Sequence, residues 1–171
     1  GPMVGAQVQQ FSRPGNPNIA EDMKTITSRL SEGVGLITYF GHSSTSSIDF
    51  NLGSPKQFNN TDGKYNFFLA NGCRAGNIFD LNFNRLNSSE SSISENFILA
   101  DKKGSVAFIS NSDLGAINYQ NLLSSEWYKA MAEDLYGKTI GEIQQQALSK
   151  AYDRTGSSDF INRCNIEQSI L

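Results

Sequence analysis

The sequence has 171 residues, of which 38% are apolar and 18% are charged, with a formal net charge of −3. This length suits one globular domain, which we place at residues 4–171 because residues 1–3 match the remnant of a cleaved tag. The acidic balance argues against a nucleic-acid partner, and no apolar run approaches the roughly 20 residues of a membrane span. One histidine and two cysteines exclude a disulfide framework and a zinc site of several Cys and His ligands. We expect no metal or other cofactor.

The first part of the chain predicts a strand, a helix and a second strand. Residues 4–11 alternate loosely between apolar and polar side chains, which favours a short strand. Residues 19–32 carry apolar side chains at helical spacing, with Asn18 opening a capping box and Gly33 at the C-terminal cap. The apolar run 35–40 is most simply a buried strand of a parallel sheet.

The middle of the chain continues this alternation. Residues 45–65 are rich in Ser, Asn, Gly and Asp and predict a surface loop, and residues 67–70 predict a second buried strand. A polar loop over residues 82–92 precedes a helix expected at residues 93–100. Residues 105–110 predict the third buried strand.

The remaining sequence is mostly helical. Apolar side chains recur at helical spacing over residues 122–135 and again over residues 140–151, and Gly137 separates the two helices. Strands that alternate with helices indicate an α/β fold, with a mostly parallel sheet flanked by helices.

Two of the predicted strands end in reactive residue types, His42 and Cys73. Ligands of an open parallel sheet gather at the carboxyl ends of its strands. If these two strands are neighbours, an imidazole and a thiol meet at one edge of the sheet. That arrangement is what a Cys–His dyad requires, because the thiolate is the nucleophile and the imidazole makes it available at neutral pH.

Glycines flank both residues: Gly41 precedes the histidine, and Gly72 and Gly76 surround the cysteine. Tight turns after strand ends need backbone angles that glycine adopts easily. Such turns leave backbone N–H groups available to bind a developing oxyanion, at about 2.7–4 kcal/mol per donor. The expected donors are the amides of Cys73 and of the residue after the histidine, Ser43.

A purely structural role stays open for each residue taken singly. Free cysteine is among the most buried residue types, and a lone histidine at a strand end is commonly a core residue with satisfied hydrogen bonds. The occurrence of both, each after an apolar strand and each among small residues, favours the functional interpretation.

The order of these blocks resembles the caspase-like clan of cysteine peptidases, and within it the gingipain-like family common in Bacteroidetes. The blocks are LITYFGHSS at residues 36–44, FFLANGCRAGNIFD at 67–80 and SISENFILADKKGSVAFIS at 92–110, with a weaker match in YGKTIGE at 136–142. The resemblance implies a caspase-like fold, of which this chain would be the C-terminal part of a larger catalytic domain.

The resemblance also implies a chemistry. Cys73 would attack the scissile carbonyl of a protein or peptide substrate, His42 would shuttle the proton, and the amides of Cys73 and Ser43 would form the oxyanion hole. The family block is usually Gly-His-Gly-Ser, so Ser43 stands where relatives have a second glycine. The acid that orients the histidine in relatives would lie upstream of this sequence.

The family further implies a place outside the cytoplasm: secreted, at the cell surface or in the periplasm. Many of its members belong to the type IX secretion pathway, among them a sortase that transfers cargo proteins to a lipid-linked sugar. Other components of that secretion system are therefore candidate partners.

Three further residues are candidates for the substrate pocket. Ser110, Asn111 and Ser112 are expected to follow the third strand, where sheet geometry would let them line the pocket for the residue before the scissile bond. Asp49 and Glu95 are alternative acids for orienting the histidine, although Glu95 is already favoured at a helix start by the helix dipole.

Two other functions compete with the peptidase. The first is a catalytically impaired pseudo-peptidase that serves as a scaffold or partner in a secretion complex. Two features motivate it: Ser43 stands in place of a glycine, and the acid that would orient the histidine is expected upstream of this sequence. The second is a small α/β binding domain in which Cys73 and His42 are incidental, although it leaves the ordered blocks unexplained.

Overall fold

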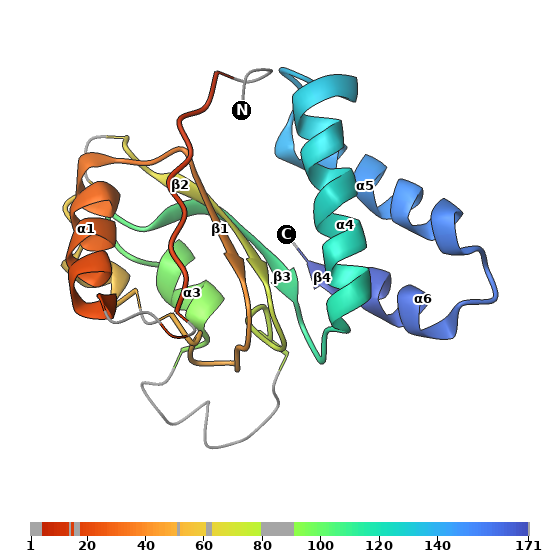
Figure 1. The fold of residues 1–171 in the computed structure, drawn as a ribbon, viewed down its shortest axis with the longest axis horizontal. Helices are drawn as coiled ribbons and strands as arrows, with labels where there is room; N and C mark the ends of the chain where they lie inside the picture. The colour runs from red at the N-terminus through yellow and green to blue at the C-terminus, as the bar shows by residue number, and fades with distance from the viewer. Residues whose placement is uncertain are drawn as a thin grey trace.

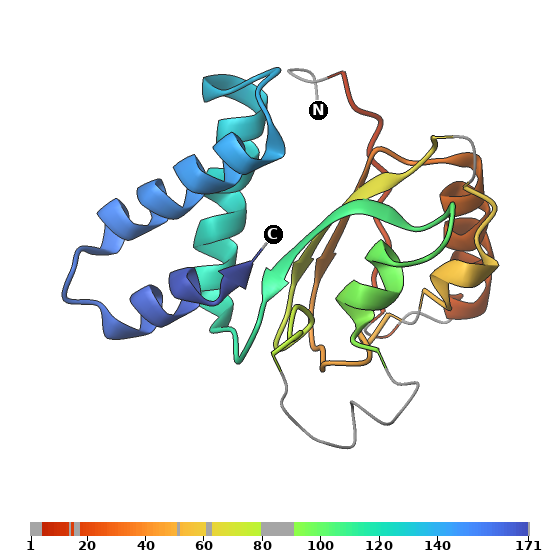
Figure 2. The ribbon, with the colours of Figure 1, turned by 180° about the vertical axis from the view of Figure 1, so that it is seen from behind.

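In the computed structural model, a sheet separates two layers of helices (Figure 1). Helices α1 and α3 cover one face of the sheet, and helices α4, α5 and α6 lie on the other face, as the view from behind also shows (Figure 2). The described residues are 5–13, 15, 18–50, 52–60, 63–79 and 91–170.

Within the described residues the sheet has four strands in the order β1-β2-β3-β4. Strand β1 (Leu36–Phe40) pairs in parallel with β2 (Asn66–Asn71), and β2 pairs in parallel with β3 (Ser105–Asn111). The short β4 (Ser169–Ile170) is antiparallel to β3. This mostly parallel sheet between helices confirms the predicted α/β class.

Alternate side chains of β2 enter two separate cores. Phe68 packs among Phe97 and Phe108, beneath α1 (Ile19–Glu32) and α3 (Ile93–Ile98). Its neighbour Phe67 points to the opposite face.

On that second face Phe67 stacks on Trp127 of α4, with ring centroids 5.1 Å apart. Helix α4 (Ile117–Lys129) continues into a π-helical turn, Ala130–Asp134, and packs against α5 (Ile140–Thr155). Because Phe67 and Trp127 are both buried, α4 is held firmly against the strand whose end carries Cys73.

The helix caps differ from the expectation at α1. The side chain of Asn18 makes no capping hydrogen bond, and its carbonyl accepts the Glu21 N–H, so the capping box predicted there is wrong. Capping boxes are present instead at Ser92, which opens α3, and at Thr139, which opens α5. Asp159 caps α6 (Phe160–Glu167) through its carboxylate.

Two strand predictions need correction. The strand expected at residues 4–11 is wrong, since the described residues 5–11 have no regular structure and are largely exposed, with Val8 at 81%. Strand β1 is half-buried and not fully buried, because it is an edge of the described sheet. Most of the polar loop expected at residues 82–92 lies outside the described residues.

No helix in the described parts of the chain is long and apolar enough to cross a membrane.

Candidate active site

The strand ends that carry His42 and Cys73 are neighbours. Phe40 and Asn71, the last residues of β1 and β2, are paired in register, and the Gly41 N–H donates to the Asn71 carbonyl at 3.1 Å. His42 and Cys73 each follow two residues after these strand ends. The condition derived from the sequence, that these two strands be neighbours, is therefore met.

The turns after these two strands are in direct contact. The Ser43 hydroxyl donates to the Cys73 carbonyl at 2.6 Å. A Cβ on Gly72 would lie 2.1 Å from Ser43 Oγ and 2.9 Å from the Gly41 carbonyl oxygen. Gly72 is thus required by the close approach of the histidine turn to the cysteine turn.

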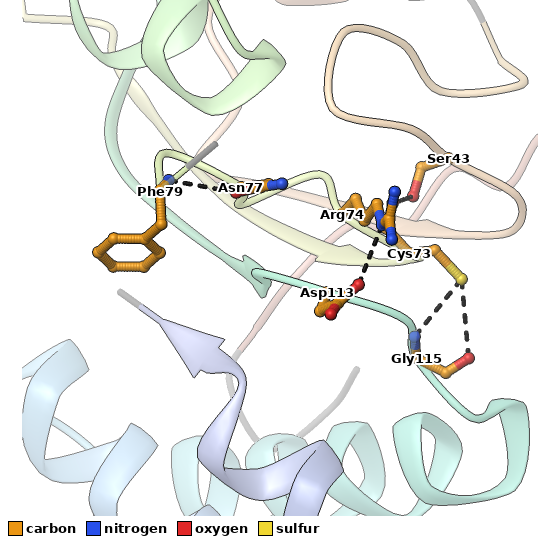
Figure 3. A network of polar contacts seen from close by, with 7 residues as sticks. All are labelled: Ser43, Cys73, Arg74, Asn77, Phe79, Asp113 and Gly115. Atoms are coloured by element: carbon orange, nitrogen blue, oxygen red, sulfur yellow. Dashed lines mark hydrogen bonds and ion pairs between the residues drawn. The ribbon is translucent and has the colours of Figure 1, made fainter. Parts of the chain in front are cut away.

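The Cys73 thiol faces Gly115, in the loop that follows β3. The thiol donates to the Gly115 carbonyl at 3.7 Å, and the Gly115 N–H donates to Sγ at 3.4 Å (Figure 3). Cys73 is half-buried and follows β2 at the carboxyl edge of the sheet. A backbone N–H aimed at the sulfur can also serve a thiolate, which accepts hydrogen bonds but cannot donate them.

The backbone of His42 is fixed and its imidazole is exposed. The His42 carbonyl accepts from the Tyr39 hydroxyl and from the Asp49 N–H, the latter at 3.0 Å. Burial raises the pKa of Tyr39, which keeps its hydroxyl protonated as a donor. The imidazole has no hydrogen-bond partner among the described residues.

The two acids considered for orienting the histidine have other partners. The Asp49 carboxylate pairs with Arg13 at 3.4 Å. The Glu95 carboxylate accepts the Ser92 N–H at 2.8 Å in the capping box of α3. Neither acid is hydrogen-bonded to the imidazole of His42 in the part of the chain that the structure describes.

The two backbone amides expected to form the oxyanion hole both lack a hydrogen-bond acceptor among the described residues. Neither the N–H of Ser43 nor that of Cys73 donates to an acceptor within the described ranges. Ser43 is paired with Ile48 in an isolated antiparallel bridge. The two hydrogen bonds of this bridge do not use Ser43 itself: the His42 carbonyl accepts one, and the Ser44 N–H donates the other.

The residues expected to line the substrate pocket are placed differently from the prediction. Ser110 and Asn111 belong to β3 itself and are buried; Ser110 already lies in the predicted strand, and the observed strand adds Asn111. The Asn111 side chain donates to Asn165 of α6 at 3.1 Å. Ser112 alone of the three follows the strand, and its N–H donates to the Gln168 carbonyl at 2.9 Å.

An ion pair beside the cysteine joins two loops. Arg74 has the left-handed backbone angle φ 57°, and its Nε donates to the Asp113 carboxylate at 3.0 Å (Figure 3). The Arg74 N–H donates to the Asp113 carbonyl at 2.9 Å. The sequence places Arg74 next to the thiol, but nothing in it signals the role of Asp113 or Gly115, about 40 residues away.

Comparison with known proteins gives one family and one fold. The sequence profile of peptidase family C25 matches residues 4–170. A search of curated protein sequences gave no match.

Solved structures with a similar fold include two of RgpB. The Arg-specific cysteine proteinase gingipain R (RgpB) superposes with a TM-score of 0.69 at 17% identity, over 85% of this chain and 33% of that one. The complex of Porphyromonas gingivalis RgpB pro- and mature domains gives a TM-score of 0.67 at 17% identity, with the same coverage. The chain thus spans about a third of the length of these structures.

Proposed function

Because this chain belongs to peptidase family C25, the gingipain-like cysteine peptidases, we propose that it cleaves or transfers peptide bonds with Cys73 as nucleophile and His42 as general base. The observation that supports this most is the pairing of Phe40 with Asn71, which sets the two strand ends side by side. His42, which is exposed, and Cys73, which is half-buried, lie on turns that touch each other.

The proposed reaction proceeds through an acyl-enzyme. His42 takes the thiol proton, and Cys73 Sγ bonds to the carbonyl carbon of the scissile peptide. The C–N bond then breaks as His42 returns the proton to the leaving amine, which leaves a thioester. Water completes hydrolysis, or an amine completes transfer, and the thiol is released.

The oxyanion formed in each step would be bound by backbone amides. The N–H groups of Cys73 and Ser43 are the proposed donors, and their freedom from described acceptors supports the assignment. The Gly115 N–H, 3.4 Å from the sulfur, would stabilise the thiolate.

The substrates we propose are secreted proteins or peptides. Gingipain R is named as Arg-specific, and RgpB was solved with its pro-domain, so protein ligands are known for the relatives. Ser112 remains a proposed pocket residue. Ser110 and Asn111, the last two residues of β3, would contribute by holding Ser112 in place. We place the protein at the cell surface, outside the cell or in the periplasm, with a sortase-like role in type IX secretion as the most specific form of the proposal.

A pseudo-peptidase that acts as a scaffold is the second candidate. It is favoured by the imidazole of His42, which contacts no acid within the described residues, and by Ser43 in place of the usual glycine.

Alkylation of the thiol separates the two candidates. Cys164→Ser removes the second cysteine, and the rate of iodoacetamide labelling of Cys73 is then measured against pH with and without His42→Ala. If the dyad is assembled, the labelling rate stays high at pH values well below ~8.5, the pKa of a free thiol. His42→Ala should abolish this labelling at low pH. Labelling that rises only near pH 8.5 and is unaffected by His42→Ala contradicts the peptidase.

A further inference from the structure

A buried amide side chain on α4 holds the segment that leads into Cys73. Gln120 is 6% exposed, lies in the first turn of the helix and donates from Nε2 to the Gly72 carbonyl at 3.1 Å. One turn later, the Ser124 hydroxyl donates to Asn71 Oδ1 at 2.8 Å. Two successive turns of α4 therefore fix the end of β2.

The same amide packs against the loop on the other side of the sulfur. A Cβ on Gly115 would lie 1.8 Å from Gln120 Nε2, so the amide occupies the space that any other residue at position 115 would need. Gly115 is the residue whose N–H and carbonyl contact Cys73 Sγ. Gln120 thus lies against both backbone segments that flank the thiol.

The hydrogen bond to Gly72 determines the direction of the next N–H. The described chain contains no cis peptide bond, so the Gly72 carbonyl and the Cys73 N–H point in opposite directions across one planar peptide. Because Gln120 fixes the carbonyl toward α4, the Cys73 N–H points away from α4. That N–H has no acceptor among the described residues.

From this geometry we infer that Gln120 is a positioning residue that aims the Cys73 N–H at the oxyanion of the reacting substrate. The inference rests on the proposed peptidase function and adds a residue that does not touch substrate. It requires that Gln120 affect oxyanion binding far more than it affects the attack of the sulfur.

Gln144 on α5 is a matched control. It has the same side chain and the same 6% exposure, and its Nε2 donates to the Ser169 hydroxyl at 2.9 Å. Replacing either glutamine by Met keeps the side-chain length and removes the amide.

Two small thiol reagents distinguish a misdirected Cys73 N–H from a general loss of thiol reactivity. N-acetylglycinal adds reversibly: a bond forms between Sγ and the aldehyde carbon, and the thiol proton ends on the aldehyde oxygen or on His42, with that oxygen in the oxyanion position. Iodoacetamide alkylates the sulfur with loss of iodide and forms no oxyanion. Aldehyde affinity is measured as protection against alkylation, in the 171-residue chain carrying Cys164→Ser.

We expect Gln120→Met to weaken aldehyde binding about tenfold to a hundredfold, somewhat less than the loss of an oxyanion-hole donor. Its alkylation rate without aldehyde should change by less than about twofold, and Gln144→Met should alter neither quantity. Equal aldehyde affinity in Gln120→Met and the parent overturns the inference and leaves the peptidase standing. A parent that fails to bind the aldehyde overturns both.

Circular dichroism shows whether Gln120→Met folds. If it does not fold, nuclear magnetic resonance of the amide protons in the parent protein tests the inference instead. Aldehyde binding should then shift the Cys73 amide proton downfield while the Gln120 side-chain amide stays protected from exchange. An unmoved Cys73 amide proton, or a rapidly exchanging Gln120 amide, overturns the inference.

Discussion

The hydroxyl of Ser43 donates a hydrogen bond of 2.6 Å to the carbonyl of Cys73, which joins the turn of the histidine to the turn of the cysteine. A glycine at this position would have no such donor. The serine side chain therefore supplies a contact between the two turns, and its backbone N–H is the one that the proposed oxyanion hole would need.

We predict that Ser43→Ala lowers the free energy of unfolding by about 1 kcal/mol, because the partly buried Cys73 carbonyl loses its donor. Ser46→Ala is the control, since Ser46 is an exposed serine of the same loop, and its effect should lie within about 0.5 kcal/mol of zero. Urea denaturation measures both values. Equal losses in the two variants would show that the hydrogen bond does not stabilise the turn.

Gly72→Ala should be more damaging, because its Cβ would overlap Ser43 Oγ and approach the Gly41 carbonyl. We expect a loss of about 1–3 kcal/mol, together with slower alkylation of Cys73. Ser43→Gly in the same chain should restore part of the stability, because it removes the side-chain overlap and leaves the Gly41 contact. Gly35→Ala is the control: its Cβ meets no atom within 4 Å, and the variant should be neutral.

The unfolding free energy should fall above pH 10. Burial raises the pKa values of Tyr39 and Tyr128 above the ordinary value of about 10. The folded protein then keeps protons that the unfolded chain releases, so this contribution is complete below pH 10 and is lost as pH rises through the folded-state pKa values.

Denaturation series between pH 8 and pH 11.5 test this dependence. Tyr128→Phe removes one of the two groups and should flatten the decline. Tyr136→Phe alters an exposed ring and should leave the slope as it is. A slope that is the same in Tyr128→Phe and the parent would show that this phenol does not contribute.

The strands were predictable because short apolar runs next to glycines are local signals. The run that became β1 ends at Phe40, as the sequence indicates, and β2 extends one residue beyond the predicted run at each end. Neighbouring parallel strands then bring their carboxyl ends together. Residues 4–11 alternate loosely between apolar and polar side chains, yet the described residues 5–11 form no strand. Alternation alone does not supply the partner strand that a sheet needs.

The supporting contacts of the site carry no local signal. Gly115 meets the thiol across 42 positions of sequence, and Gln120 meets Gly72 across 48. A glutamine in the first turn of a helix is an ordinary surface residue until the helix packs on the strand end. The structure places Ser110 and Asn111 within β3, because this strand reaches Asn111 and leaves only Ser112 after its end.

The antiparallel strand β4 has a consequence for synthesis on the ribosome. It pairs with Ser110 and Asn111, and the Gln168 carbonyl before it holds the Ser112 N–H, just upstream of the loop that faces the thiol. A nascent chain that has emerged only as far as Gly115 lacks these contacts from β4 and Gln168. The surroundings of Cys73 are therefore completed only after residue 170 has left the exit tunnel, so a partly made chain carries the nucleophile but not its finished environment.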